Sequence, residues 1–174
     1  MLADSAVVTP SLAAIVKDQI VAKGARRVAV TTLPDIAPFP AFNQLPAANT
    51  AILGQLATAF NTGLTTGLAG VDVRYIDGQA LFQGLIKGGG FANVTAGACD
   101  PAKIAVITGN RITDGSSLAC NASAGQPFNG MKATASASTW LFADGVHPST
   151  GGHKAIGDYV IAKIKEWGWI PSNL

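Results

Sequence analysis

Segments with helical and with strand-like patterns alternate in the first half of the chain, and this alternation limits the fold more than any other feature. Apolar residues recur at helical spacing over Thr9–Lys23, with Pro10 at the first helical position and Gly24 as the C-cap. The β-branched run Arg26–Leu33 comes next and predicts a buried strand. A helix followed by a buried strand favours a parallel sheet.

The same alternation continues towards the C-terminus. Pro46–Leu68 carries one apolar face and predicts a helix, and Val71–Ile76 after it predicts a second strand. Asp77 is a suitable N-cap for a short amphipathic helix over the residues that follow it, up to Ile86. A closing helix is predicted over His153–Trp167. The pattern as a whole predicts an α/β fold.

Residues 91–139 are different, because no period of either kind is sustained there. A short strand at Ile104–Ile107 is the one element that the pattern favours. Long irregular segments in compact domains are usually functional or held by a crosslink. The two cysteines, Cys99 and Cys120, lie in this segment. They could crosslink the loop or remain as two buried free thiols, and the sequence pattern leaves both possibilities open.

Length and composition set further bounds. A chain of 174 residues fits a single domain over residues 1–174. Its 48% hydrophobic and 13% charged residues are typical of a globular protein. The formal net charge is only +2, and Lys and Arg form no stripe, so we expect no nucleic-acid partner. No run approaches the roughly 18 apolar residues that a transmembrane segment needs.

The low charge and the abundance of Ala, Gly, Ser and Thr favour an exported protein, either secreted or located in the periplasm or at the cell surface. The first residues lack the basic start and the apolar stretch of a signal peptide. We therefore expect that any targeting segment is absent from this chain.

The strongest chemical signal is the pair Asp144 and His147, three residues apart in a turn that contains glycine. A carboxylate at this spacing can accept a hydrogen bond from Nδ1 of the imidazole and leave Nε2 free. That arrangement makes a general base with its orienting group. The alternative is that Asp144 caps the last helix and His147 is an ordinary loop residue.

Metal and cofactor chemistry find little support in the sequence. His153 is the only other histidine, and no Cys or Glu lies near it at ligand spacing. We therefore expect no metal site and no organic cofactor, and we expect His153 on the surface of the last helix.

The residues around Asp144 and His147 resemble a block of a known protein family. The stretch Trp140–Val160, with Asp-x-Val-His-Pro at its centre, resembles the last block of the SGNH/GDSL esterase and lipase family. In that family an aspartate and a histidine complete a Ser-His-Asp triad. The resemblance therefore implies that Asp144 orients the ring, that His147 is the general base, and that the fold is a three-layer parallel sheet with helices on both faces, similar to flavodoxin.

Other segments extend the resemblance towards the exported bacterial esterases of the family. Gly24–Asp35 resembles the family's penultimate buried strand, and Gly90–Thr95 together with Cys99 resembles the exported branch. A disulfide in the long loop is expected in that branch. The resemblance therefore implies a Cys99–Cys120 crosslink.

The resemblance runs along the whole chain but corresponds to the C-terminal part of a family member. The Gly-Asp-Ser-Leu block with the nucleophile and the blocks with the oxyanion-hole glycine and asparagine are not found. Asp4-Ser5 repeats two letters of the first block, but no strand precedes Ser5. We therefore expect a fold that is incomplete relative to the family. The other serines considered lie in loops without a Gly-x-Ser-x-Gly turn: Ser116, Ser117, Ser136, Ser138 and Ser149, the last of which suits the beginning of the closing helix.

The expected function is hydrolysis of a carboxylic ester, either a small molecule or a lipid, by acyl transfer to a serine. One alternative is a truncated, non-catalytic half that pairs an exposed sheet edge with a second copy or with a missing N-terminal segment. Another is a binding module whose loops over residues 91–139 hold a carbohydrate or an acyl group, with His147 merely lining the pocket.

Overall fold

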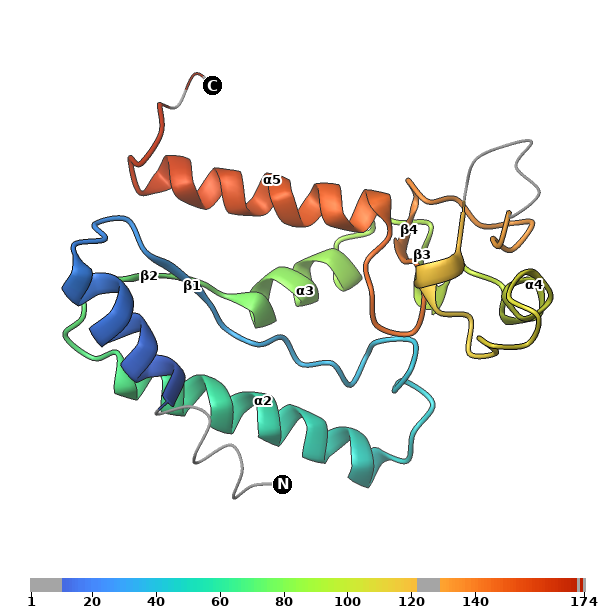
Figure 1. Cartoon of the computed structure of the whole chain (residues 1–174), viewed down its shortest axis with the longest axis horizontal. Coiled ribbons are helices and arrows are strands. Elements are labelled where there is room, and N and C mark those ends of the chain that lie inside the picture. Colours follow the sequence, from blue (N-terminus) through green and yellow to red (C-terminus); the bar gives the residue numbers. More distant parts are fainter. Residues whose placement is uncertain (1–10, 122–128, 172, 174) are drawn as a thin grey trace. The chain divides into compact units, whose positions relative to one another are not determined.

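The structure is a computed structural model that describes residues 11–121, 129–171 and 173, and it consists of two compact units (Figure 1). Helices alternate with strands along the chain, and the strands form two parallel pairs, so the predicted α/β class is confirmed. The single domain expected over residues 1–174 stays a prediction. The first unit comprises Met1–Asp35, Ala47–Phe82 and Val160–Leu174, and the second comprises Ile36–Pro46 and Gln83–Tyr159.

The predicted first helix is present, but most of it is not regular α-helix. Residues 11–14 are α-helical, the π-helix η1 spans Ile15–Ile20, and the 3-10 turn η2 spans Val21–Lys23. Gly24 ends the helix with a φ of 100°, a left-handed conformation in which glycine meets no steric penalty. Its predicted role as C-cap is confirmed, whereas Pro10 lies outside the described residues.

The strands of the first unit form a parallel pair. Strand β1, Ala29–Thr31, pairs in parallel with β2, Arg74–Ile76, and helix α2, Ala47–Gly67, lies between them in sequence. The predicted helix-strand alternation is thereby confirmed. The expected burial of the whole first strand is wrong, because successive side chains of a strand point to opposite faces and only the face of Val30 is buried.

The core of the first unit joins the first helix, β1 and the end of α2. Leu64 is fully buried at its centre. The first helix and α2 lie close together at Gly67: a Cβ added to this glycine would lie only 2.7 Å from the Cβ of Ala13. Apolar packing therefore holds this unit together. The buried members of the core are Ala13, Val16, Val30, Leu64 and Leu68.

Helix α3, Gly78–Lys87, follows β2 as the sequence predicts. Asp77 Oδ1 accepts a hydrogen bond from the backbone N–H of Ala80 at 3.0 Å, which confirms Asp77 as the N-cap. The glycines that follow end the helix, and Gly89 has a positive φ of 69°.

The second unit contains another parallel pair. Strand β3, Asn93–Gly97, pairs with β4, Trp140–Phe142, with a shift in register between its two paired positions. The side chain of Asn93 accepts hydrogen bonds from the backbone N–H groups of Thr95 and Ala96, which lie between the two paired positions of β3. The sequence pattern did not predict β3, because an irregular strand lacks alternation.

The expected strand at Ile104–Ile107 is wrong, since these residues form the end of helix α4, Pro101–Ile107. Asp100 is its N-cap and accepts hydrogen bonds from two backbone N–H groups of the first turn. Pro101 occupies the first helical position, where a missing N–H has no cost. Apolar residues next to one another occur in short helices as well as in strands, and the cap decides between the two here.

Helix α5 spans Thr150–Glu166 and begins three residues before the predicted start at His153. The hydroxyl of Ser149 accepts a hydrogen bond from the backbone N–H of Gly152 at 3.1 Å, so Ser149 caps the helix as expected. Within residues 11–121 and 129–171, no helix is both long and apolar enough to cross a membrane.

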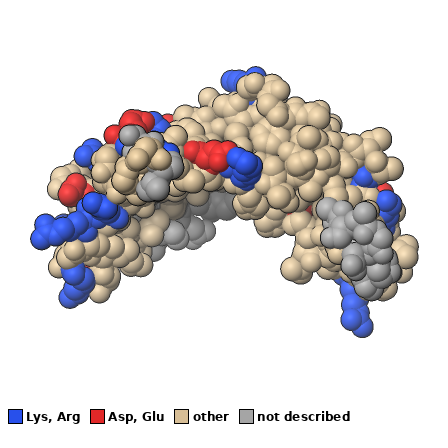
Figure 2. Space-filling view, turned by 90° about the horizontal axis from the view of Figure 1, so that it is seen from above, with Lys and Arg blue, Asp and Glu red and all other residues tan. Residues whose placement is uncertain are grey.

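Most of the surface drawn in Figure 2 belongs to uncharged residues. This agrees with the low proportion of charged residues in the sequence, 13%. The expectation that nucleic acid is not a partner stays a prediction.

Candidate active site

The candidate site lies at the carboxyl end of β4, where a tight loop carries Asp144 and His147. The parallel ladder continues past β4, because the backbone N–H of Cys99 donates to the carbonyl of Ala143 at 2.7 Å. The N–H of Ala143 in turn donates to the carbonyl of His147 at 2.8 Å and closes the loop. Carboxyl ends of parallel strands are where α/β proteins usually place functional groups.

Asp144 and His147 are in direct contact, as their spacing predicts. Nδ1 of His147 lies 2.8 Å from Oδ2 of Asp144 and 3.0 Å from Oδ1. The carboxylate is buried, at 6% exposure, whereas the imidazole is 64% exposed. No residue in the described parts of the chain forms a hydrogen bond to Nε2. The ring is therefore held through Nδ1 and open at Nε2.

Three backbone N–H groups also donate to the carboxylate. Oδ1 accepts from Val146 at 2.9 Å and from His147 at 2.8 Å, while Oδ2 accepts from Ser117 at 2.7 Å. Burial alone would raise the pKa of Asp144. These backbone hydrogen bonds, together with one from the side chain of Ser117, outweigh burial and hold its pKa well below the ordinary value. Asp144 is therefore ionised at neutral pH. The alternative in which Asp144 caps the last helix is wrong, because Ser149 caps it.

The contact with Ser117 is the part of the site that the sequence did not reveal. Ser117 begins the 3-10 turn η3, Ser117–Ala119, which lies 27 residues before Asp144. Every residue except proline has a backbone N–H, so the sequence does not show which of them donates to Asp144. The available signals were the serine at position 116, which suits an N-cap, and the nearby Cys120, whose crosslink limits where this turn can lie.

Cys99 and Cys120 form a disulfide, which confirms the expected crosslink and rules out two free thiols. The bond joins the residue at the end of the β3 ladder to the residue that follows η3. It therefore connects the two segments that meet at Asp144.

Most of the loop serines have structural partners. Ser149 donates to the carbonyl of Trp140, and Ser116 accepts from the backbone N–H of Leu118. Ser136 and Ser138 bond to each other at 2.9 Å. Ser5 lies outside the described residues. Ser117 and Ser149 are the serines among these that line the pocket beside His147.

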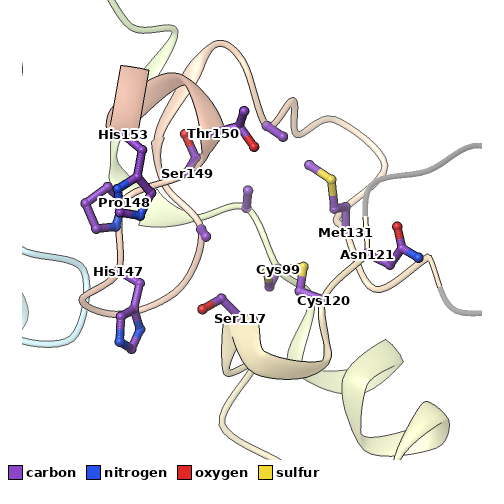
Figure 3. Close-up of a pocket in the computed structure, with 13 residues that line it drawn as sticks. Cys99, Ser117, Cys120, Asn121, Met131, His147, Pro148, Ser149, Thr150 and His153 are labelled. Atoms are coloured by element: carbon purple, nitrogen blue, oxygen red, sulfur yellow. A yellow bond between two sulfur atoms is a disulfide. The ribbon is translucent and has the colours of Figure 1, made fainter. Parts of the chain in front are cut away.

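A pocket of about 440 Å³ opens beside His147 (Figure 3). One part of its wall is apolar and consists of small side chains, Met131 and the disulfide. Another part is polar and includes the hydroxyl groups of Ser117 and Thr150. Such a combination suits a small ligand with an apolar portion and a polar centre. The apolar lining comprises Ala98, Cys99, Cys120, Met131, Ala137, Ala143 and Pro148.

His153 lies in the first turn of α5 at the border of this pocket and is exposed, as expected. In the part of the chain that the structure describes, no three His, Cys, Asp or Glu side chains come close enough together to hold a metal ion.

Comparison with protein families places these observations in context. A family model described as GDSL-like Lipase/Acylhydrolase matches residues 3–160, which include the strand pairs, Asp144 and His147. The chain belongs to this family. The predicted membership and the α/β fold class are thus confirmed, and the chain is a member of a family of ester hydrolases. No curated protein matches this GDSL-family chain.

Proposed function

We propose that this GDSL-family chain is a carboxylic ester hydrolase of the Ser-His-Asp type, with His147 as general base and Asp144 as its orienting group. The observation that supports the proposal most directly is the 2.8 Å contact between Nδ1 of His147 and Oδ2 of Asp144, next to an open Nε2. The alternative of a carbohydrate- or acyl-binding module gives this geometry no role, whereas a non-catalytic half would carry it without turnover.

The proposed reaction has two halves. A serine hydroxyl attacks the ester carbonyl while Nε2 of His147 accepts its proton. The C–O bond to the alcohol then breaks, and the imidazolium returns the proton to the departing alcohol. In the second half, water attacks the acyl-enzyme with the same histidine as base, and the serine is released.

Asp144 suits the role of orienting group because it stays ionised. Its low pKa follows from the three backbone donors that hold the carboxylate and from the side chain of Ser117. An ionised carboxylate against Nδ1 fixes the tautomer of His147 with its basic nitrogen at Nε2 and stabilises the imidazolium that forms during attack.

The pocket beside His147 suggests the class of substrate. Its small apolar side chains suit the hydrocarbon portion of a small-molecule or lipid ester, and His147 lies at its border, where the ester carbonyl would be attacked. The disulfide suits a secreted or periplasmic protein, because oxidising compartments preserve such bonds.

Hydrolysis of p-nitrophenyl butyrate by the 174-residue chain and by its His147→Ala variant tests the proposal. We expect turnover by the wild-type chain and a fall in kcat of about a thousandfold or more in the variant, since triad members act as one unit. Lys154→Ala is the matched control. Lys154 is 75% exposed and pairs with Asp158 on α5, so its loss should leave kcat unchanged.

Equal turnover by the wild-type chain and His147→Ala would contradict the proposed base. A wild-type chain that binds the ester, retains it after His147→Ala and never hydrolyses it would be a binding module instead.

A further inference from the structure

We propose that the backbone N–H of Ser117 positions the Asp144–His147 pair, and that the Cys99–Cys120 disulfide holds this N–H in place. The inference rests on the proposed function of the pair, because it assigns a cause to the orientation of its carboxylate. Ser117 is a positioning residue in this account, since it acts on His147 through Asp144.

The two carboxylate oxygens are held by different parts of the chain. Oδ1 accepts the N–H groups of Val146 and His147, both from the turn that contains Asp144 itself. Oδ2 is the closer oxygen to Nδ1, and its backbone donor is Ser117, from a separate segment. The local turn therefore holds one oxygen, while the oxygen closest to the imidazole depends on a remote donor.

The segment with Ser117 has little apolar anchoring of its own. It is a single 3-10 turn capped by the hydroxyl of Ser116. The large side chain of this turn, Leu118, is 88% exposed, so its burial does not hold the turn against the rest of the unit. A single turn without buried apolar contacts needs another constraint to stay in one place.

The disulfide supplies that constraint. Cys120 directly follows the turn, and its N–H donates to the carbonyl of Ser117 at 3.1 Å. Its sulfur is bonded to Cys99, whose N–H donates to Ala143, the residue before Asp144. One disulfide and two hydrogen bonds therefore link Ser117 to the backbone that carries Asp144, and Figure 3 shows Ser117 beside the two cysteines.

Strand β3 also lies close to the backbone of Asp144, at Gly97. A Cβ added to Gly97 would lie 2.7 Å from the Cα of Asp144 and 2.8 Å from its carbonyl carbon. Glycine therefore allows β3 to approach the backbone of Asp144. Strand β3 therefore constrains the backbone of Asp144, and Ser117 constrains Oδ2 of its carboxylate. Both segments are distant from Asp144 in sequence.

Two substitutions of Ser117 together separate the effect of its N–H from that of its hydroxyl. Ser117 is the first residue of a helical turn, a position where proline is well tolerated. Ser116 before it has φ −49° and ψ 134°, the extended conformation that a residue preceding proline prefers. Ser117→Pro therefore deletes the donor without opposing the local backbone, and Ser117→Ala is its matched control, because it removes the hydroxyl and keeps the N–H.

The readout is the NMR signal of the Nδ1 proton of His147, which is shifted downfield and protected from exchange while a carboxylate holds it. The chain has two histidines, so ¹⁵N-histidine labelling gives two ring systems, and His153→Gln assigns them. We expect the protected signal in the wild-type chain and in Ser117→Ala. We expect its loss in Ser117→Pro, together with a kcat about tenfold or more below that of Ser117→Ala and little change in KM.

Retention of the protected signal in Ser117→Pro would overturn the positioning role. Should that variant fail to fold, Cys99→Ala/Cys120→Ala tests the same idea, and an unchanged Nδ1 signal there would overturn the role of the disulfide. The signal does not require turnover. An inactive chain with the expected NMR pattern would therefore contradict the proposed function and leave the positioning inference standing.

Discussion

The two units of this molecule add different contacts to their parallel strand pairs. The pair β1–β2 packs against helices through a buried apolar core with Leu64 at its centre. The pair β3–β4 ends in loops that are held by a disulfide and by hydrogen bonds to a buried carboxylate. The first unit is ordered by apolar burial. The second unit also buries apolar side chains, among them Ile104, Leu141 and Phe142, but a few specific bonds hold the loops that carry its candidate site.

The apolar core of the first unit contributes to the stability of the fold, whereas the specific bonds of the second unit position the candidate catalytic pair. A core of apolar side chains sets the stability of the fold. An imidazole that serves as a base must in addition be held in the correct orientation by its carboxylate. The unit that carries Asp144 fixes it from several remote segments. Substitutions in the two units should therefore differ in whether they change the stability, the site, or both.

The largest loss of stability is expected for Leu64→Ala in the first unit. This side chain is fully buried, so its removal should lower the free energy of unfolding by about 2–5 kcal/mol. Ile52→Ala on the same helix is the control, because Ile52 is 52% exposed and should cost much less. Urea denaturation measures the free energy of unfolding of both variants. Equal losses would contradict the burial of Leu64 in the core of the first unit.

Removal of the disulfide should have the next largest effect. Cys99 and Cys120 are 21 residues apart, and closing a loop of this size stabilises a fold by about 3 kcal/mol. Cys99→Ala/Cys120→Ala should therefore lower the unfolding midpoint and also reduce kcat. A variant that loses stability but keeps full kcat would show that the disulfide does not support the site.

A smaller, pH-dependent effect is expected for Asp144→Asn. The pKa of Asp144 is depressed in the folded state, so its stabilising contribution is present above the unfolded pKa of about 3.9 and is lost as the pH falls. The variant should be about 1–3 kcal/mol less stable than the wild-type chain at pH 7. The difference should shrink below about pH 4, and a constant difference from pH 7 to pH 3 would contradict the assigned hydrogen bonds.

The smallest effect is expected for Val106→Ser on α4 in the second unit. Val106 is 81% exposed, so the free energy of unfolding should change by less than about 0.5 kcal/mol. Thermal unfolding at two protein concentrations measures it. A larger, concentration-dependent loss would indicate that a second copy of the chain covers this helix.

The sequence predicted the first unit well because its order comes from periodic apolar residues. The helix before Gly24, the helix α2 and the capping role of Asp77 all follow from such local signals. In the second unit the same reasoning assigned a strand to Ile104–Ile107, although the cap at Asp100 makes the segment helical.

Within the candidate site, the spacing of Asp144 and His147 was sufficient to predict their contact. Ser117 could not be predicted, because its contribution is a backbone N–H that depends on folding of a remote loop. Apolar periodicity reports burial, and local spacing reports contacts within one turn. Neither reports which separate segments meet.

The measurement that tests the central claim most directly is labelling of the purified chain with a serine-directed fluorophosphonate, followed by peptide mass spectrometry, in wild type and His147→Ala. The account predicts one labelled serine in the wild-type chain, which identifies the nucleophile, and labelling at least a hundredfold slower in the variant. The absence of any labelled serine, or equal labelling rates in the two proteins, would contradict the claim that Asp144 and His147 activate a serine in this chain.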